Sequence, residues 1–217
     1  MRWFYLIEKL CNNLTKRIQN KMPDIDEERA EIINYGLQLI FGEFPKTIIL
    51  ILIAYIFGVL KLSLLSLIFI MPYRVFSGGV HLKTHIGCVI ATSIFYIGNA
   101  VLSKNIIITP IYLKNIIIIL IWIFSMYMIK LYAPADTIAV PILRKKDRRI
   151  KKILSYVTMS MTLIITLFIK DSTISNLLIF GTLFQTISIT RLIYRITNNK
   201  YGYEEYLKEN NKLKDMA

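Results

Sequence analysis

The residues best suited to chemistry lie together in the segment FSGGVHLKTHIGC, residues 76–88. It contains both histidines of the chain, His81 and His85, and one of its two cysteines, Cys88. A neutral imidazole close to a thiol can accept its proton, and the resulting thiolate can attack a carbonyl carbon. The segment is therefore a candidate site for nucleophilic catalysis by cysteine.

Either histidine could act as the base. In a continuous helix His85 would face Cys88, whereas His81 would lie about 10.5 Å away along the helix axis. His81 can reach Cys88 only if the chain leaves the helical path before Cys88. The pair Gly78–Gly79 allows such a departure, because glycine adopts backbone conformations that other residues avoid. The amides of these glycines, or those that begin the next helix, could also stabilise a developing oxyanion.

The same residues have less specific interpretations. A cysteine at a helix start is often only a small apolar side chain, and Arg74 could simply anchor a helix end among lipid headgroups. His81, His85 and Cys88 have helical spacing for a metal, but this set is one ligand short of a tetrahedral zinc site and has no HExxH pattern. We expect no metal and no cofactor, and we expect Cys11 and Cys88 to be free thiols.

The remainder of the chain is an apolar scaffold for this segment. Of the 217 residues, 55% are hydrophobic, and they are concentrated in long blocks. Several blocks approach the ~20 residues that a transmembrane helix needs, and the strict alternation of barrel strands is absent. The sequence therefore predicts an all-α integral membrane protein. The expected spans are 47–60, 62–73, 86–102, 115–129, 153–169 and 174–194.

The number of spans depends on Lys61, which could lie inside one span over 47–71 or at the turn of a short hairpin. A lysine at mid-bilayer costs roughly 2.5–3.5 kcal/mol, which does not decide the question. Six spans with a cytosolic N-terminus leave only Lys61, Lys104, Lys114 and Lys170 of the 27 lysines and arginines outside. Five spans would place a large basic segment on the outer side of the membrane, against the excess of lysine and arginine expected in cytosolic segments. We therefore predict six spans.

The expected organisation is a single membrane domain. Amphipathic helices occupy 1–44, the six-helix transmembrane bundle occupies 45–194, and a cytosolic tail follows over 195–217. Apolar residues recur at three- and four-residue steps over 3–18, which is typical of a helix that lies in the membrane surface. We expect no cleaved signal peptide, because the N-terminus lacks an uninterrupted apolar core.

The spacing of an arginine, a glycine pair, a histidine and a cysteine within 74–88 resembles the signature of the accessory gene regulator B (AgrB) family. Members are bacterial membrane cysteine endopeptidases that process a quorum-sensing pro-peptide. Three more segments are similar to parts of that family: DEERAEIINYGLQLI at 26–40, YAPADT at 132–137 and RKKDRR at 144–149. The resemblance implies a multi-pass protein of the bacterial cell membrane, and we expect both termini in the cytosol.

The resemblance also implies roles for individual residues. His81 would be the general base and Cys88 the nucleophile, while Arg74, Gly78 and Gly79 would orient the substrate or support an oxyanion. Cys88 would expel the tail of the pro-peptide and hold the rest as a thioester. A thiol or hydroxyl within the peptide would then close a ring and release the enzyme.

The implied substrate is membrane-bound, with an amphipathic N-terminal helix and an acidic C-terminal tail. Basic side chains after residues 132–137, here called the central loop, are candidates to bind that tail, although such residues also set topology and attract anionic lipid. These candidates are Arg144, Lys145, Lys146, Arg148 and Arg149. The other expected partners are the lipid bilayer and a second copy of the chain, and nucleic acid is not expected.

Two other classes of protein remain as alternatives. A small multi-span transporter would be expected to show inverted halves or helices broken at mid-bilayer. A non-enzymatic membrane partner protein would have no use for His81 and Cys88. Loss of pro-peptide cleavage on substitution of these residues would distinguish an enzyme from both.

Overall fold

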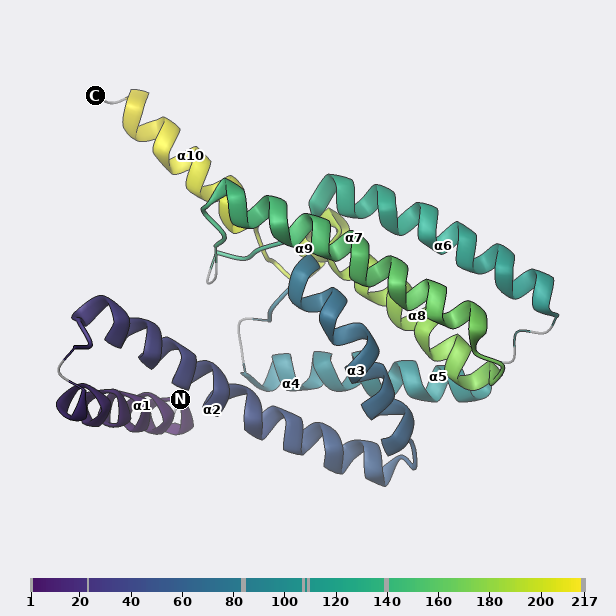
Figure 1. Cartoon of the computed structure of the whole chain (residues 1–217), viewed down its shortest axis with the longest axis horizontal. Coiled ribbons are helices and arrows are strands. Elements are labelled where there is room, and N and C mark those ends of the chain that lie inside the picture. Colours follow the sequence, from purple (N-terminus) through teal and green to yellow (C-terminus); the bar gives the residue numbers. More distant parts are fainter. Residues whose placement is uncertain are drawn as a thin grey trace. The chain divides into compact units, whose positions relative to one another are not determined.

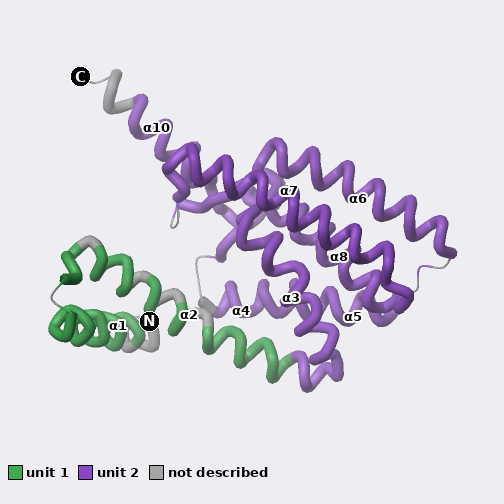
Figure 2. The backbone as a smooth tube through the Cα atoms, in the orientation of Figure 1, with its two compact units in different colours: residues 1–53 green, residues 54–217 purple. Residues whose placement is uncertain are grey.

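The computed structural model describes residues 2–22, 24–82, 85–106, 108, 110–138 and 141–215. Throughout these ranges the regular structure is helical, with no strand, as Figure 1 shows, so the all-α prediction is confirmed there. A single parallel bridge joins Gly78 to Ala135. The helices fall into two compact units, residues 1–53 and 54–217, which Figure 2 distinguishes.

The first unit contains α1 (Arg2–Lys21) and most of α2 (Glu27–Ile56). Asp26 precedes α2, and its Oδ1 accepts a hydrogen bond of 2.8 Å from the amide of Arg29, which satisfies one of the free donors at the helix start. Asn34 of α2 donates to Asn12 of α1 at 2.8 Å. Helices thus occupy the predicted N-terminal segment, and their amphipathic role at a membrane surface stays a prediction.

The chain turns at Gly58 rather than at Lys61. Helix α2 ends at Ile56 and α3 (Leu60–Ser77) begins after a short turn. Gly58 has a φ of +63°, a left-handed conformation that favours glycine and ends a helix. Lys61 therefore lies in the first turn of α3, and that helix is longer than the predicted segment 62–73. The charge at Lys61 was a weaker turn signal than the glycine.

Four of the described helical segments are long and apolar enough to cross a membrane: 60–77, 86–105, 111–132 and 145–168. They correspond to α3, to the continuous run α4 (His85–Ser93), η1 (Ile94–Gly98) and α5 (Asn99–Asn105), to α6 (Ile111–Tyr132), and to α7 (Lys145–Phe168). This supports a membrane protein. The count of six spans stays a prediction.

The last predicted span, 174–194, is divided between two helices. Helix α8 (Ser172–Ser188) begins with a cap in which Asp171 accepts from the amide of Ile174 at 2.9 Å. The chain then leaves the helix at Ile189 and Thr190 before α9 (Arg191–Ile196) and α10 (Gly202–Asp215).

Helix α8 lies at the centre of the second unit, where it contacts α3, α5, α6 and α7. Its Gly181 brings the backbone close to Ile70 of α3 and Asn99 of α5, where a Cβ atom would come within 2.9 Å of the side chains of both. Buried Asn99 donates to Ser66 Oγ at 2.9 Å and to the carbonyl of Leu177 at 3.0 Å. Small residues and polar links of this kind are typical of helices that pack within membranes.

Candidate active site

The chain leaves the helical path between the two glycines and Cys88, which is the condition that His81 needs. Helix α3 ends at Ser77, and Gly78 (φ +74°) and Gly79 (φ +144°) turn the backbone. Residues 78–82 are not helical, and α4 begins at His85. His81 is exposed on the segment after the turn, and Cys88 is half-buried in the first turn of α4.

The remaining sequence candidates near Cys88 are placed only in part. The backbone of His85 begins α4, whereas its side chain lies outside the described residues. Cys88 and Cys11 are both free thiols, and Cys11 is buried in α1. Among the side chains that the structure describes, no group of three histidine, cysteine or acidic residues gathers to hold a metal ion.

The glycine turn is held by the loop between α6 and α7. The amide of Gly79 donates to the carbonyl of Ala135 at 2.9 Å, and the amide of Ala135 donates to the carbonyl of Ser77 at 2.8 Å. A Cβ atom on Gly78 would overlap the backbone of Ala135, so this close approach requires glycine. Two segments that stood out separately in the sequence, 76–88 and 132–137, are therefore neighbours in the fold.

The amides of both glycines already have acceptors. Gly78 donates to the carbonyl of Arg74 at 2.9 Å, and Gly79 donates to Ala135. The oxyanion role suggested for these amides would therefore require the turn to open. In this structure the glycines shape the backbone.

Arg74 binds the turn itself. From α3 its Nη1 donates to Oε1 of Gln185 at 3.1 Å, and its Nη2 donates to the carbonyl of Val80 at 3.3 Å. The guanidinium carbon also lies 5.6 Å from the centre of the Phe95 ring, within the range of a cation–π contact. Arg74 thus fixes the chain on both sides of the glycines, immediately before His81.

Gln185 is the residue at the centre of this network, and sequence reasoning missed it. Its side chain is fully buried in α8. The amide nitrogen donates to Ser77 Oγ at 2.9 Å and to the carbonyl of Gly78 at 2.8 Å, while the amide oxygen accepts from Arg74. The available signal was a glutamine inside an apolar segment, because polar residues in such segments mark functional positions.

Tyr194 supports the loop between α6 and α7, and sequence reasoning also missed it. Its hydroxyl is buried and lies 2.9 Å from the carbonyl oxygen of Ala135 and 3.1 Å from that of Asp136, to which it can donate. The ring of Tyr201 stacks on it with centroids 4.1 Å apart. Side chains from the C-terminal segment therefore fix the loop that holds the glycine turn.

Among the five basic residues proposed for substrate binding, Arg148 has a structural task. Its guanidinium pairs with buried Asp136 at 3.0 Å, donates to the carbonyl of Pro134 at 3.3 Å, and lies 4.3 Å from the centre of the Tyr203 ring. Asp136 also accepts from the amides of Ile142 and Tyr203, at 2.9 and 3.1 Å. The side chains of Arg144, Lys145, Lys146 and Arg149 are exposed.

Comparison with known proteins identifies the family of this chain. The family model described as accessory gene regulator B (AgrB) matches residues 11–189. The chain therefore belongs to the AgrB family. Membership supports a role in the accessory gene regulator system, which is a quorum-sensing system, and the family is linked to processing of an autoinducing peptide.

Relatives that are named as AgrB-like proteins cover nearly the whole chain. One from Clostridium acetobutylicum is 29% identical over 206 residues, which are 93% of this chain and 94% of the relative. One from Clostridium perfringens is 35% identical over 186 residues, 84% of this chain and 91% of the relative. One from Listeria innocua is 30% identical over 83% of this chain and 87% of the relative. No solved structure matches the chain.

Proposed function

We propose that this protein is a cysteine endopeptidase of the cell membrane that removes the C-terminal tail of an autoinducing-peptide precursor and promotes ring closure. Cys88 is the nucleophile and His81 the general base. The observation that carries the proposal is the fixed, non-helical turn at Gly78–Gly79. The chain stays non-helical from this turn through Leu82, and α4 begins at His85. His81 and Cys88 are therefore not held two helical turns apart, as they would be in one continuous helix.

The chemistry begins with transfer of the Cys88 proton to His81. The thiolate attacks the carbonyl that joins the future signal to the tail, and the imidazolium returns the proton to the departing amine of the tail. The peptide is then held as a thioester. A thiol or hydroxyl of the bound peptide attacks this thioester, which forms the ring and restores the Cys88 thiol.

Ring closure needs a site that holds the peptide folded and keeps water out. Exchange of one thioester for another is nearly balanced in free energy, so the entropy of closing the ring must be offset by preorganised binding. Water would otherwise hydrolyse the acyl-enzyme. A half-buried Cys88 at the start of an apolar helix is consistent with both requirements.

The acidic tail would be attracted by the exposed basic side chains before and within the start of α7. Arg144, Lys145, Lys146 and Arg149 suit this task, because Arg148 already holds the central loop. Attraction between exposed charges is screened by salt. In the proposed topology six spans place this basic segment, the glycine turn and both termini on the cytosolic side.

The test is cleavage of the cognate pro-peptide by the wild-type chain and by three single variants. We expect Cys88→Ala and His81→Ala to abolish processing, and His85→Ala to retain most of it. Membrane insertion and monodispersity in detergent, measured for each variant, separate lost chemistry from lost folding. If His85 proves indispensable and His81 does not, the base is assigned wrongly. If Cys88→Ala still cleaves, the protein is not a cysteine endopeptidase.

A further inference from the structure

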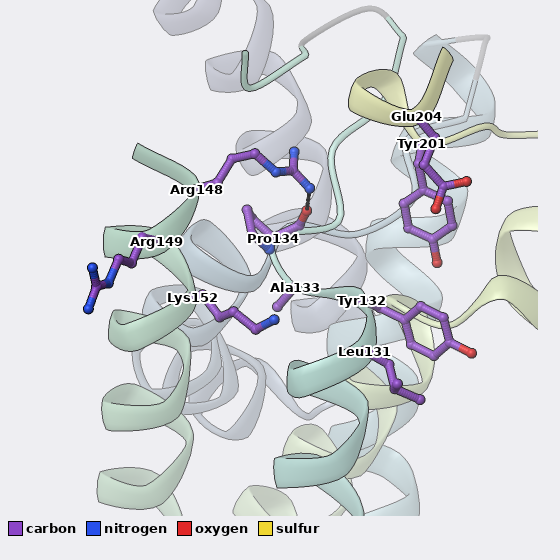
Figure 3. A pocket seen from close by; sticks show the side chains of 9 residues that line it. All are labelled: Leu131, Tyr132, Ala133, Pro134, Arg148, Arg149, Lys152, Tyr201 and Glu204. Atoms are coloured by element: carbon purple, nitrogen blue, oxygen red, sulfur yellow. Dashed lines mark hydrogen bonds between the residues drawn. The ribbon is translucent and has the colours of Figure 1, made fainter. Parts of the chain in front are cut away.

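A pocket of about 300 Å³ opens between the end of α6 and the start of α7. Figure 3 shows its lining. Arg148 and Lys152 extend from α7 toward the Ala133–Pro134 segment, and Arg149 extends away from them at the outer edge. Tyr201 from the C-terminal segment lies across the opening from α7.

The charges of this pocket leave a positive excess. Arg148 is paired with Asp136 at 3.0 Å, and the one carboxylate in the lining, Glu204, is paired with Arg191 at 2.7 Å. Lys152 donates to the carbonyl of Lys130 at 2.6 Å, which uses one of its protons without neutralising its charge. In the part of the chain that the structure describes, neither Lys152 nor Arg149 forms an ion pair. The pocket is thus suited to an anion.

The surroundings of the pocket favour an amphiphilic anion. It lies at the end of two helices that can each cross a membrane. Leu131 in its lining is 50% exposed, and Ile153, one turn beyond Arg149 on the same face of α7, is 52% exposed. Tyr132 and Tyr201, whose rings stack 6.2 Å apart, stand beside the charged groups. Such aromatic side chains are typical of the boundary between headgroups and hydrocarbon.

We propose that this pocket binds the phosphate headgroup of an anionic glycerophospholipid. The phosphate would accept from Lys152, and Arg149 at the outer edge would add to the attraction of its negative charge. The acyl chains would cover the exposed apolar residues Leu131 and Ile153. Basic pockets between transmembrane helices are known to hold such headgroups. An acidic peptide could satisfy the charges, but it would leave Leu131 and Ile153 uncovered.

The occupied pocket would also support the candidate active site, a step that rests on the proposed function. Ala133 and Pro134 line the pocket, and the next residue, Ala135, forms the two backbone hydrogen bonds that hold the glycine turn. Arg148 joins the pocket to the carbonyl of Pro134. A headgroup that orders this wall of the pocket would therefore stabilise the turn before His81.

The binding test compares two double variants with the same loss of charge on the same helix. Arg149→Gln with Lys152→Gln removes the two pocket cations that form no ion pair among the described residues, and Lys145→Gln with Lys146→Gln removes two exposed lysines outside the pocket. Native mass spectrometry of the full chain would measure retention of phosphatidylglycerol against phosphatidylcholine. We expect the pocket variant to lose phosphatidylglycerol binding by about tenfold or more, and the control by less than about twofold.

Three results would overturn the assignment. If the pocket variant retains the lipid as the wild type does, the site lies elsewhere. If the control loses as much, the attraction is diffuse. If inorganic phosphate or a short oligoglutamate peptide displaces phosphatidylglycerol at micromolar concentration, the pocket recognises a free anion or a peptide.

The activity test uses wild-type protein in nanodiscs of phosphatidylglycerol or phosphatidylcholine. Faster processing in phosphatidylglycerol, lost in the single variant Lys152→Gln, is expected if the headgroup supports the turn. Lys152 is changed alone here because Arg149 is also proposed to attract the substrate tail. Equal processing rates in both lipids, with headgroup binding intact, would show that headgroup binding does not support the glycine turn. A complete lack of processing in every lipid counts against the proposed endopeptidase and leaves the binding result standing.

Discussion

Replacing Gln185 by leucine removes the buried side chain that joins α8 to the glycine turn. The carbonyl of Gly78 and the hydroxyl of Ser77 each lose a donor, and Arg74 loses an acceptor. The Gly78 carbonyl keeps only a longer hydrogen bond of 3.4 Å from the Ser77 hydroxyl. A buried polar group left without a partner costs about 1–3 kcal/mol. Because leucine recovers part of this through apolar contact, we expect the free energy of unfolding to fall by about 2–4 kcal/mol.

Gln185→Glu tests the oxygen of the side-chain amide separately from its nitrogen, because it keeps the acceptor and removes the donor. A carboxylate can still accept from Arg74, but it cannot donate to the carbonyl of Gly78. The amide nitrogen of Gln185 now lies 2.8 Å from that carbonyl oxygen, and glutamate would place a second acceptor oxygen at about the same distance. We therefore expect Gln185→Glu to be more stable than Gln185→Leu and still impaired in pro-peptide cleavage. Thermal unfolding in detergent and the cleavage rate per folded protein would measure the two effects.

Asn176→Leu is the matched control, because Asn176 is a second buried amide in the same helix and bonds the carbonyl of Ile106. It lies nine residues from Gln185, roughly 13.5 Å along the axis. We expect this variant to lose stability while the folded fraction retains its cleavage rate. A Gln185→Leu protein that cleaves as fast as the wild type would refute the idea that Gln185 positions the turn.

Two other substitutions, with one control, probe the contact between the glycine turn and the central loop. Gly78→Ala forces a residue with a Cβ into a φ of +74° against the backbone of the central loop. We therefore expect the free energy of unfolding, measured by thermal unfolding, to fall by about 1–3 kcal/mol. Gly98→Ala, whose Cβ would meet only an ordinary contact at 3.9 Å, should be neutral or stabilising, and equal effects of the two would contradict this explanation. Asp136→Asn removes the ionic partner of half-buried Arg148, and we expect it to lower the free energy of unfolding by about 1–3 kcal/mol. An unchanged unfolding midpoint would show that the amide replaces the carboxylate without cost.

The residues that sequence reasoning found are those whose types are scarce in an apolar chain. His81, Cys88 and the glycine pair stand out locally, and long apolar blocks indicate spanning helices without any knowledge of their packing. The departure from helix before Cys88 was allowed by Gly78–Gly79, but the sequence alone did not require it. The structure supplies the reason for it in a second loop.

The residues that were missed act over long distances in sequence. Gln185 contacts Ser77 and Arg74, more than a hundred positions earlier, and Tyr194 contacts Ala135. These contacts depend on which helices pack together, and the hydropathy of the sequence does not predict that packing. The error at Gly58 was local, because the charge of a nearby lysine was given more weight than backbone conformation.

The link between the glycine turn and the central loop consists of main-chain atoms on both sides. Truncation of a side chain cannot delete it, so the junction is sensitive to chain length. One residue inserted between Tyr132 and Ala135 would move the chain by roughly 3.4 Å and present a different carbonyl to Gly79. Insertions and deletions within this stretch should therefore be far more damaging than exchanges of its outward-facing side chains.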